Sequence, residues 1–255
     1  MHDRDAVNIV TLKWGTLYGP EYVNYLYHGI QRHLTRPFRF LCFTDDATGV
    51  EAGIECLDFP EFSIDHPGYE WYTWTAWRKF SLLRDDVPFA GMSLFLDLDV
   101  LITGPMDRFF EYGRPEEFAI IHNWIEWRKT LFRKKPDIGN SSCFRFLAGH
   151  FHFAYERLMA NPIRMIDEFP TEQAALTDCV RAHRIYWPDA WVRSFKRHCR
   201  PAFPLNRFVE PRFRPEASII AFHGRPHPDQ ALAGYAGTRI HHFTKPTTWI
   251  GTHWR

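Results

Sequence analysis

The stretch from Ser93 to Ile102 places the tightest constraint on what this chain can fold into. It reads SLFLDLDVLI, so every position after the serine is apolar except Asp97 and Asp99. A strand that is apolar on both faces is typical of the centre of a parallel sheet covered by helices on both sides. Residues two apart in a strand project to the same side, so we expect both carboxylates on one face. The stretch therefore predicts an α/β fold built around a central strand that carries two acids.

The order of the other elements also favours a parallel sheet. Strand-like runs at 7–12 and 38–43 flank a helical pattern at 21–34, which is the order of a βαβ unit. Ligands of such sheets bind beyond the carboxyl ends of the strands, which makes the loops at 13–18 and 44–46 candidate site loops. No repeat, linker or low-complexity tract interrupts the sequence, and we expect a single domain over 1–255. Further strands are expected at 55–59, 118–121 and 218–222, and further helices at 74–83, 151–159 and 172–183.

Charge and cysteine content exclude several classes of protein. The 31 Lys and Arg residues nearly balance the 30 Asp and Glu residues, so no overall positive field favours nucleic acid. The five cysteines form no CxxC pair, which indicates reduced thiols in a cytoplasmic protein. The first residues, MHDRDAVNIV, carry acids and no apolar core, unlike a signal peptide. No stretch reaches the ~20 apolar residues of a membrane span.

Two aspartates inside an apolar strand need partners. Buried carboxylates are costly unless they are hydrogen-bonded or bound to a metal, and Mg²⁺ or Mn²⁺ prefers such oxygen ligands. The alternative is that one aspartate caps the turn that follows at 103–105. His223 ends a late strand and is a candidate third ligand, although a structural histidine is an open alternative. Arg225 and His227 stand next to it and could contact phosphate oxygens.

With these motifs in place, the chain resembles metal-dependent GT-A glycosyltransferases, especially the family 8-like bacterial group. The resemblance implies a GT-A type fold, with a Rossmann-like, mostly parallel central sheet flanked by helices. It also implies a nucleotide-binding half at 7–120 and an acceptor and closing half at 121–255. The matching segments follow the family's order at 11–24, 43–46, 77–80, 94–99, 140–142, 172–173 and 222–228.

The resemblance also implies a role for individual residues. The closing loop carries His227 where the family commonly has a lysine, so either Arg225 takes over the phosphate contact or phosphate affinity is lower. The metal ligands would be Asp99, His223 and Asp97, the last of which could instead contact ribose. Glu172 and Gln173 would stand beside the anomeric carbon. The donor would be held by Thr11, Lys13, Tyr18, Asp45 or Asp46, Arg78 or Lys79, Asn140, Ser141, Gly224 and His227.

The activity that the resemblance implies is sugar transfer from a nucleotide-diphosphate sugar, with a UDP-linked donor, Mn²⁺ or Mg²⁺, and retention of configuration. The acceptor would be a carbohydrate or a lipid-linked molecule. A lipid-linked acceptor would place the enzyme at the inner face of the membrane as a peripheral protein, assisted by the basic, aromatic C-terminus. The segment 123–137 is expected to form an acceptor wall, a contact in a homo-oligomer, or a solvated helix.

Two other functions stay open from the sequence. A sugar nucleotidyltransferase would need a glycine-rich phosphate loop, and residues 14–19 are sparse in glycine and lack a basic residue. A catalytically silent nucleotide-sugar-binding protein is the second, favoured by His227 in the closing loop. Single residues also have structural interpretations: Arg78 and Lys79 as a solvated helix face, and Glu172 with Gln173 as part of a helix cap after Thr171.

Overall fold

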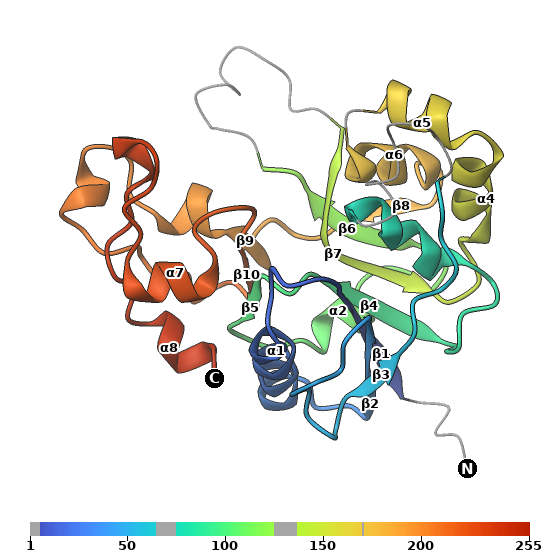
Figure 1. Ribbon diagram of the computed structural model, residues 1–255, viewed down its shortest axis with the longest axis horizontal. Coiled ribbons are helices and arrows are strands. Elements are labelled where there is room, and N and C mark those ends of the chain that lie inside the picture. The colour runs from blue at the N-terminus through green and yellow to red at the C-terminus, as the bar shows by residue number, and fades with distance from the viewer. Residues whose placement is uncertain (1–5, 65–74, 125–136, 170) are drawn as a thin grey trace.

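A seven-stranded sheet forms the centre of the molecule (Figure 1). The computed structural model describes residues 6–64, 75–124, 137–169 and 171–255. The strand order is β3-β2-β1-β4-β7-β6-β8, in which only β7 runs antiparallel to its two neighbours. The fold is therefore α/β with a mostly parallel sheet, as the sequence predicted. The strands are β1 (Val7–Lys13), β2 (Phe38–Thr44), β3 (Glu55–Leu57), β4 (Met92–Leu96), β6 (Phe118–His122), β7 (Gly139–Leu147) and β8 (Arg184–Tyr186).

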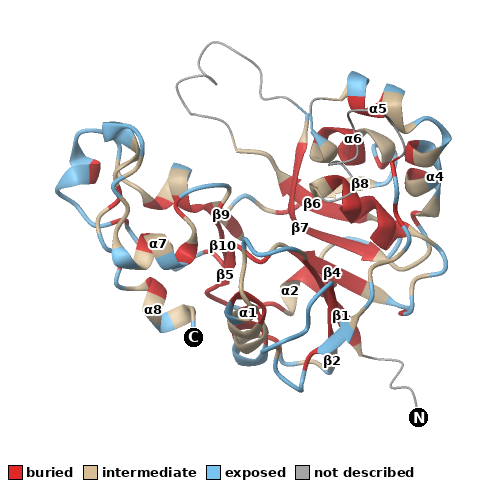
Figure 2. Cartoon of the chain, in the orientation of Figure 1, coloured by how far each residue is buried: buried red, intermediate tan, exposed pale blue. Residues whose placement is uncertain are grey.

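Helices cover both faces of this sheet, and each face has its own core. Ile9 of β1 packs with the apolar face of α1 (Pro20–His33), while its neighbour Val10 packs into the core on the other face. Figure 2 shows the inner strands of the sheet as the buried layer between the helices. Because alternate side chains enter different cores, β1 is buried along its whole length. The second face is covered by η2 (Ala76–Leu83), α4 (His152–Ala160), α5 (Pro162–Glu168) and α6 (Glu172–Cys179).

The expected single strand at 93–102 is wrong, because the chain changes sheets at the two aspartates. β4 ends at Leu96, residues 98–99 form a turn, and β5 (Val100–Ile102) belongs to a separate three-stranded sheet. In that sheet β5 pairs with β10 (Ile219–Ala221), which also pairs with β9 (Val192–Ser194). Apolar residues continue through the turn because Leu98 is buried in the core next to α1. The continuous apolar pattern therefore conceals the change of sheet.

Sequence analysis did not predict β7, although this strand lies inside the sheet between β4 and β6. Its first residues are small and polar, and Arg145 interrupts its apolar run. This arginine is fully buried, and its guanidinium donates hydrogen bonds to the backbone carbonyls of Tyr112 and Arg114. Buried charges are tolerated where such partners satisfy them. The polar pattern of β7 is therefore explained by contacts that only the folded chain provides.

Several element boundaries differ from the expectation. The helix expected at 172–183 ends at Cys179, because His183 already pairs with β6 through the Phe118 amide (2.8 Å). The expected helix at 74–83 is a 3₁₀ helix, and Trp74 lies outside the described residues.

The C-terminal part adds η3 (Phe195–Cys199), a π-helix, followed by η4 (Leu205–Arg207), α7 (Pro228–Ala233), η5 (Ile240–His242) and α8 (Ile250–His253). Among the described residues, no helix is long and apolar enough to cross a membrane.

Candidate functional site

A pocket of about 190 Å³ lies at the carboxyl ends of β1 and β4. This is the edge at which ligands of open α/β sheets bind. The pocket joins the loop after β1 to the turn that carries the two aspartates, two segments that the sequence named as site candidates. Its walls are Leu12, Trp14, Leu17, Tyr18, Ala76, Lys79, Asp97, Leu98 and Asp99.

The two carboxylates are held between the two sheets by backbone hydrogen bonds on either side of their turn. The Asp97 amide donates to the carbonyl of Ser142 in β7 (3.0 Å). The carbonyl of Asp99 accepts from the Phe222 amide, directly after β10 (2.9 Å). The position of the acids therefore depends on both sheets, and neither acid caps a turn at 103–105 in any hydrogen bond that the described residues form.

Asp97 begins a chain of polar contacts that runs to α6. The Lys79 ammonium lies 2.8 Å from Oδ1 and 3.0 Å from Oδ2 of Asp97. It also donates to Oγ of Ser141 (3.0 Å), and that hydroxyl donates to Oε1 of Glu172 (2.7 Å). Next to this chain, the Asn140 amide donates to Oε1 of Gln173 (3.2 Å). The structure thus brings three predicted site residues, Asp97, Ser141 and Glu172, into one network around Lys79.

The N-terminus of α6 serves the fold and this network together. The Thr171 hydroxyl accepts a hydrogen bond from the Ala174 amide (3.3 Å), as a helix N-cap does. The cap places Glu172 and Gln173 in the first turn, where their side chains reach Ser141 and Asn140 on β7. The capping interpretation and the site interpretation of these residues are therefore compatible.

Asp99 is more deeply buried than Asp97 and has a different environment. Its Oδ2 accepts a hydrogen bond from the Tyr18 hydroxyl at 3.2 Å. Burial, and then the nearby Asp97 carboxylate, raise the pKa of Asp99, while Lys79 and the Tyr18 hydrogen bond oppose the shift. Among the described acids, Lys79 pairs with Asp97 alone, so a cation bound next to Asp99 would favour the charged form of that carboxyl group.

Tyr18 connects the aspartate turn to the loop that follows β10. Its hydroxyl lies 3.3 Å from Nδ1 of His227, and the two rings meet edge to face. The His227 amide donates to Oε1 of Gln230 (3.1 Å) at the start of α7. Burial lowers the pKa of His227, so this side chain is a neutral partner of Tyr18 at neutral pH. The position at which the resemblance implied a lysine is therefore occupied by a residue that contacts both loops.

His223 lies in the same loop, against β9. Its Nε2 is 2.6 Å from Oγ of Ser194, and its ring stacks on Trp124 with ring centres 5.5 Å apart. Burial, followed by the charge of nearby Lys196, lowers the pKa of His223 to about 4. The imidazole is therefore neutral, which is the form that binds metal ions.

Lys196 is the functional candidate that sequence reasoning missed. It belongs to η3, and its ammonium donates a hydrogen bond to the backbone carbonyl of His223. A side chain on Gly224 would begin 3.3 Å from this ammonium, and the positive φ of Gly224 (+67°) is a second reason for glycine there. The Asp99 carboxylate raises the pKa of Lys196, against the larger lowering effect of burial. Nothing local in the basic run at 196–197 distinguishes this lysine from a solvated one.

The predicted nucleotide residues of β1 and β2 stabilise the loops of the pocket. Lys13 donates to the Asp46 carbonyl (3.0 Å), and Asp45 accepts from the Gly15 amide (2.9 Å). Thr11 is fully buried, and its hydroxyl donates to the Leu96 carbonyl (2.8 Å), which ties β1 to β4. Their contact with a base or ribose stays a prediction.

Of the two adjacent basic residues, Lys79 and not Arg78 contacts the acids of the pocket. The Arg78 guanidinium lies over the Phe59 ring, 4.5 Å from its centre. Arg225 is exposed beside Pro226. The segment 125–136, which contains most of the expected acceptor wall, lies outside the described residues.

A divalent cation fits this donor set only with ligands from a substrate. No group of three His, Cys, Asp or Glu side chains in the described part of the chain is arranged to hold a metal. Mg²⁺ commonly binds through one or two carboxylates together with substrate phosphates, and that pattern needs no protein cage. Because Lys79 engages both oxygens of Asp97, Asp99 and His223 would be the protein ligands.

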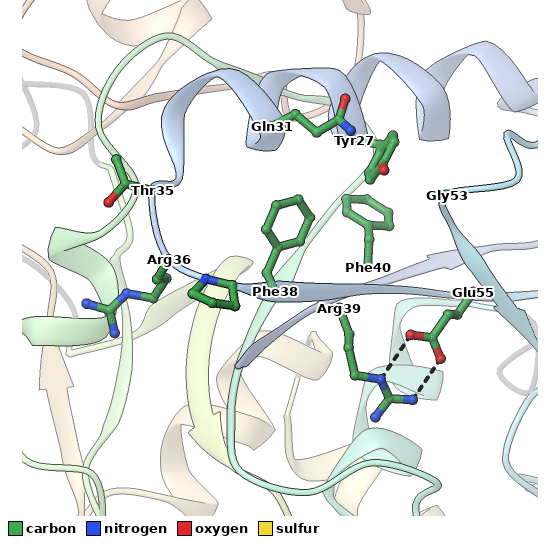
Figure 3. Close-up of a pocket in the computed structure, with 10 residues that line it drawn as sticks. Tyr27, Gln31, Thr35, Arg36, Phe38, Arg39, Phe40, Gly53 and Glu55 are labelled. Carbon is green, nitrogen blue, oxygen red and sulfur yellow. Dashed lines mark hydrogen bonds and ion pairs between the residues drawn. The ribbon is translucent and has the colours of Figure 1, made fainter. Parts of the chain in front are cut away.

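A larger cavity lies elsewhere and lacks this chemistry. It measures about 550 Å³ between α1 and the amino-terminal end of β2, and aromatic rings of Tyr27, Phe38 and Phe40 form one wall (Figure 3). Its charged lining is Arg36 and the Arg39–Glu55 pair, whose side chains are joined by two hydrogen bonds of 2.9 and 2.7 Å. None of the predicted site residues lines this cavity.

The sequence matches no protein-family model and no curated protein. The fold nevertheless resembles solved glycosyltransferases. It is similar to the galactosyltransferase LgtC, solved with donor and acceptor sugar analogues, with a TM-score of 0.57 and 13% identity over 87% of this chain and 88% of that chain. The apo bifunctional glycosyltransferase WbbM gives 0.60 and 12%, over 89% of this chain and 47% of its own. Mouse xyloside xylosyltransferase 1 gives 0.53 and 10%, over 87% and 98%. At these identities the likeness shows the fold alone, and that fold is the α/β arrangement of GT-A glycosyltransferases.

Proposed function

We propose that this protein transfers a sugar from a nucleoside-diphosphate sugar, with UDP as the nucleotide, to a hydroxyl group of an acceptor. The observation that carries the proposal is the cluster of Lys79, Asp97, Asp99 and Tyr18 at the carboxyl ends of β1 and β4. A GT-A type sheet places a nucleotide at that edge. Residues with the chemistry for phosphates, a cation and sugar hydroxyls meet there.

In this proposal, different residues of the pocket bind different parts of the donor. The loops anchored by Lys13 and Asp45 hold the base and ribose. Asn140 and Ser141 bind sugar hydroxyls, and Glu172 and Gln173 lie next to them in the first turn of α6. These two stabilise positive charge that develops at the anomeric carbon during transfer. No covalent nucleophile is assigned, and retention of configuration belongs to the proposal.

The diphosphate leaving group needs positive charge, because it gains negative charge as the glycosidic bond breaks. Mn²⁺ or Mg²⁺, held by Asp99 and His223, supplies Lewis-acid stabilisation of that charge when bound. Lys196 donates a hydrogen bond to the His223 carbonyl and contributes an ammonium that interacts with the Asp99 carboxylate. In this proposal Lys196 makes the phosphate contact, for which the sequence offered either Arg225 or a lower phosphate affinity.

Nucleotide binding tests the proposal directly. We expect UDP with Mn²⁺ to raise the thermal unfolding midpoint, and EDTA to remove most of the shift. Ligand at 100 times its dissociation constant adds about 2.7 kcal/mol, which corresponds to roughly 5–10 °C for a chain of this size. GDP, CMP and ADP measured in the same way identify the base. If no nucleotide shifts the unfolding midpoint, the proposal is contradicted.

Two other results would favour the alternative functions. Pyrophosphate release from a nucleoside triphosphate and a sugar phosphate would favour the nucleotidyltransferase. Nucleotide binding without turnover on any acceptor would favour a silent binding protein.

Lys196→Met should weaken UDP binding about tenfold and leave UMP binding unchanged. Losing a hydrogen bond to a charged group costs about 1.5–3 kcal/mol, and only UDP carries the second phosphate. Isothermal titration of both nucleotides checks the difference, and Arg197→Met, at the exposed neighbouring position, is the matched control. Equal weakening of UDP and UMP would mean that Lys196 only supports the His223 loop.

A further inference from the structure

Exposed apolar side chains are concentrated at one end of the C-terminal part of the chain. Seven large hydrophobic side chains of the described residues are exposed, and five of them lie in two short segments. Contiguous exposed apolar patches of this kind mark interaction surfaces more often than scattered residues do. The five are Phe203 (50%), Leu205 (57%), Phe208 (72%), Val209 (47%) and Ile240 (59%).

The two segments form one surface, which we call the tip and define as residues 200–214 and 239–245. The Asn206 side chain donates to the carbonyls of Phe243 (2.8 Å) and Ile240 (3.4 Å). Arg207 lies over the Phe243 ring, 5.9 Å from its centre. Figure 2 shows these turns as an exposed projection at the end of the molecule beyond α7. The apolar side chains are therefore displayed together on a fixed support.

The tip is strongly basic in a chain that is nearly neutral. It contains six Lys or Arg residues and one acid, Glu210, while the whole chain has 31 Lys and Arg against 30 Asp and Glu. The acid is itself bound to the Thr248 hydroxyl (2.8 Å). The remainder of the chain therefore carries more acidic than basic residues, and the positive charge is local. A basic surface next to exposed apolar groups is complementary to an anionic partner that is apolar underneath.

A cavity at the tip has lining residues that suit the same kind of partner. It measures about 380 Å³ and lies between η4 and η5. Arg207 and Arg239, both exposed, contribute guanidinium groups to its walls, and Ile240 lines it as well. Two guanidinium groups beside an apolar side chain suit a phosphate group attached to a hydrocarbon.

We propose that the tip docks on an anionic lipid bilayer. Phe203, Leu205, Phe208, Val209 and Ile240 enter the interface between headgroups and acyl chains, and Arg207 and Arg239 bind lipid phosphates. Such binding depends on the apolar area that is buried and on attraction to anionic lipids. The proposal does not rest on the proposed sugar transfer, since it concerns a different surface.

The tip, and not the C-terminal tail that the sequence suggested, is the surface with free apolar groups. The aromatic residues of the tail pack into the fold: Trp249 donates to the Pro211 carbonyl (2.8 Å), and Trp254 contacts the Tyr22 and Tyr25 rings. The tip is also continuous with the candidate site through η3, which begins beside His223 and ends at Cys199. Docking through the tip would hold the candidate site close to the bilayer.

Vesicle flotation tests the proposal with the full chain. We expect the protein to float with phosphatidylcholine vesicles that contain 30% phosphatidylglycerol, and to stay at the bottom with phosphatidylcholine alone. Binding should weaken when salt is raised, because the Debye length shortens to about 3 Å at 1 M. Leu205→Ser with Phe208→Ser, and separately Arg207→Glu with Arg239→Glu, should each lower the partition coefficient at least tenfold. All four side chains are exposed, so these variants should keep the unfolding midpoint of the parent.

Matched controls on another face separate this surface from general stickiness. Phe153→Ser in α4 and Arg164→Glu in α5 change an exposed apolar and an exposed basic residue away from the tip, and they should bind vesicles like the parent. Equal flotation with neutral vesicles, or binding that is insensitive to both tip variants, would overturn the proposal. Self-association that Phe208→Ser abolishes, without any vesicle binding, would instead assign the tip to a second copy of the chain. If UDP fails to bind in the separate thermal test, the proposed sugar transfer is contradicted, and the interpretation of the vesicle experiment does not change.

Discussion

Asp99→Asn is expected to remove the metal-dependent part of UDP binding and to lower sugar transfer at least a hundredfold. The asparagine keeps the shape of the side chain and an oxygen that can accept the Tyr18 hydrogen bond. It removes the charge that, in the proposed mechanism, holds a divalent cation against the donor phosphates. Removing an electrostatic contribution of this kind typically costs about 10²–10³ in rate.

The stability of Asp99→Asn should not fall with its activity. The pKa of Asp99 is raised chiefly by burial, which means that its charged form is disfavoured in the fold. A neutral amide avoids that cost, so the unfolding midpoint should stay the same or rise. A variant that folds well and transfers no sugar would identify Asp99 as functional and not structural.

The measurement is UDP release from UDP-sugars together with the Mn²⁺-dependent thermal shift. Asp229→Asn is the matched control, because that carboxylate accepts the Tyr22 hydroxyl (2.6 Å) and does not line the pocket. It should keep both the activity and the metal dependence. If Asp99→Asn retains more than a tenth of the activity, the metal assignment is wrong.

Lys79→Met should lower both stability and activity. Its ammonium contacts both oxygens of Asp97 and the Ser141 hydroxyl, while the Lys79 side chain is 5% exposed. Removing one partner of a buried pair costs about 3–5 kcal/mol, and we expect about 1–3 kcal/mol because the Asp97 side chain is 26% exposed. Activity should fall about a hundredfold, because the network that positions Ser141 and Glu172 loses its centre. Urea unfolding and steady-state rates give the two quantities.

A second substitution distinguishes a functional lysine from a structural one. Lys79→Met combined with Asp97→Asn removes the unpaired charge and should recover most of the lost stability without recovering activity. Recovery of both would mean that the pair serves only the fold. Arg78→Met tests the other basic residue that the sequence offered, and it should reduce activity less than Lys79→Met does.

The elements that sequence analysis predicted well are those whose signal is local. Helix α1 follows from apolar residues at helical spacing, and Pro20 lies at its start. The parallel pairing of β1 and β2 follows from a strand, helix and strand of ordinary length. The aspartates of the turn were found because acids are conspicuous in an apolar run. Their joint placement with Lys79 and Tyr18 was expected only through the family resemblance.

Other features could not be derived from local pattern. The buried Arg145 of β7 donates hydrogen bonds to the carbonyls of Tyr112 and Arg114, which lie 33 and 31 residues earlier in the chain. The division of the apolar run into β4 and β5 depends on which strands pair with each half. Both features arise from contacts between distant segments, which the pattern of neighbouring residues does not encode.

The sequence by itself determined the fold class, the βαβ start and the residue types that could bind a cation and a diphosphate. These follow from hydrophobic periodicity and from the free-energy cost of burying charge, both of which act along short stretches. Only the tertiary structure decided that Lys79 and not Arg78 meets Asp97, that Lys196 joins the His223 loop, and that five apolar side chains share one exposed tip. The physical reason is that a side chain's partners and its exposure are set by segments packed from far along the chain.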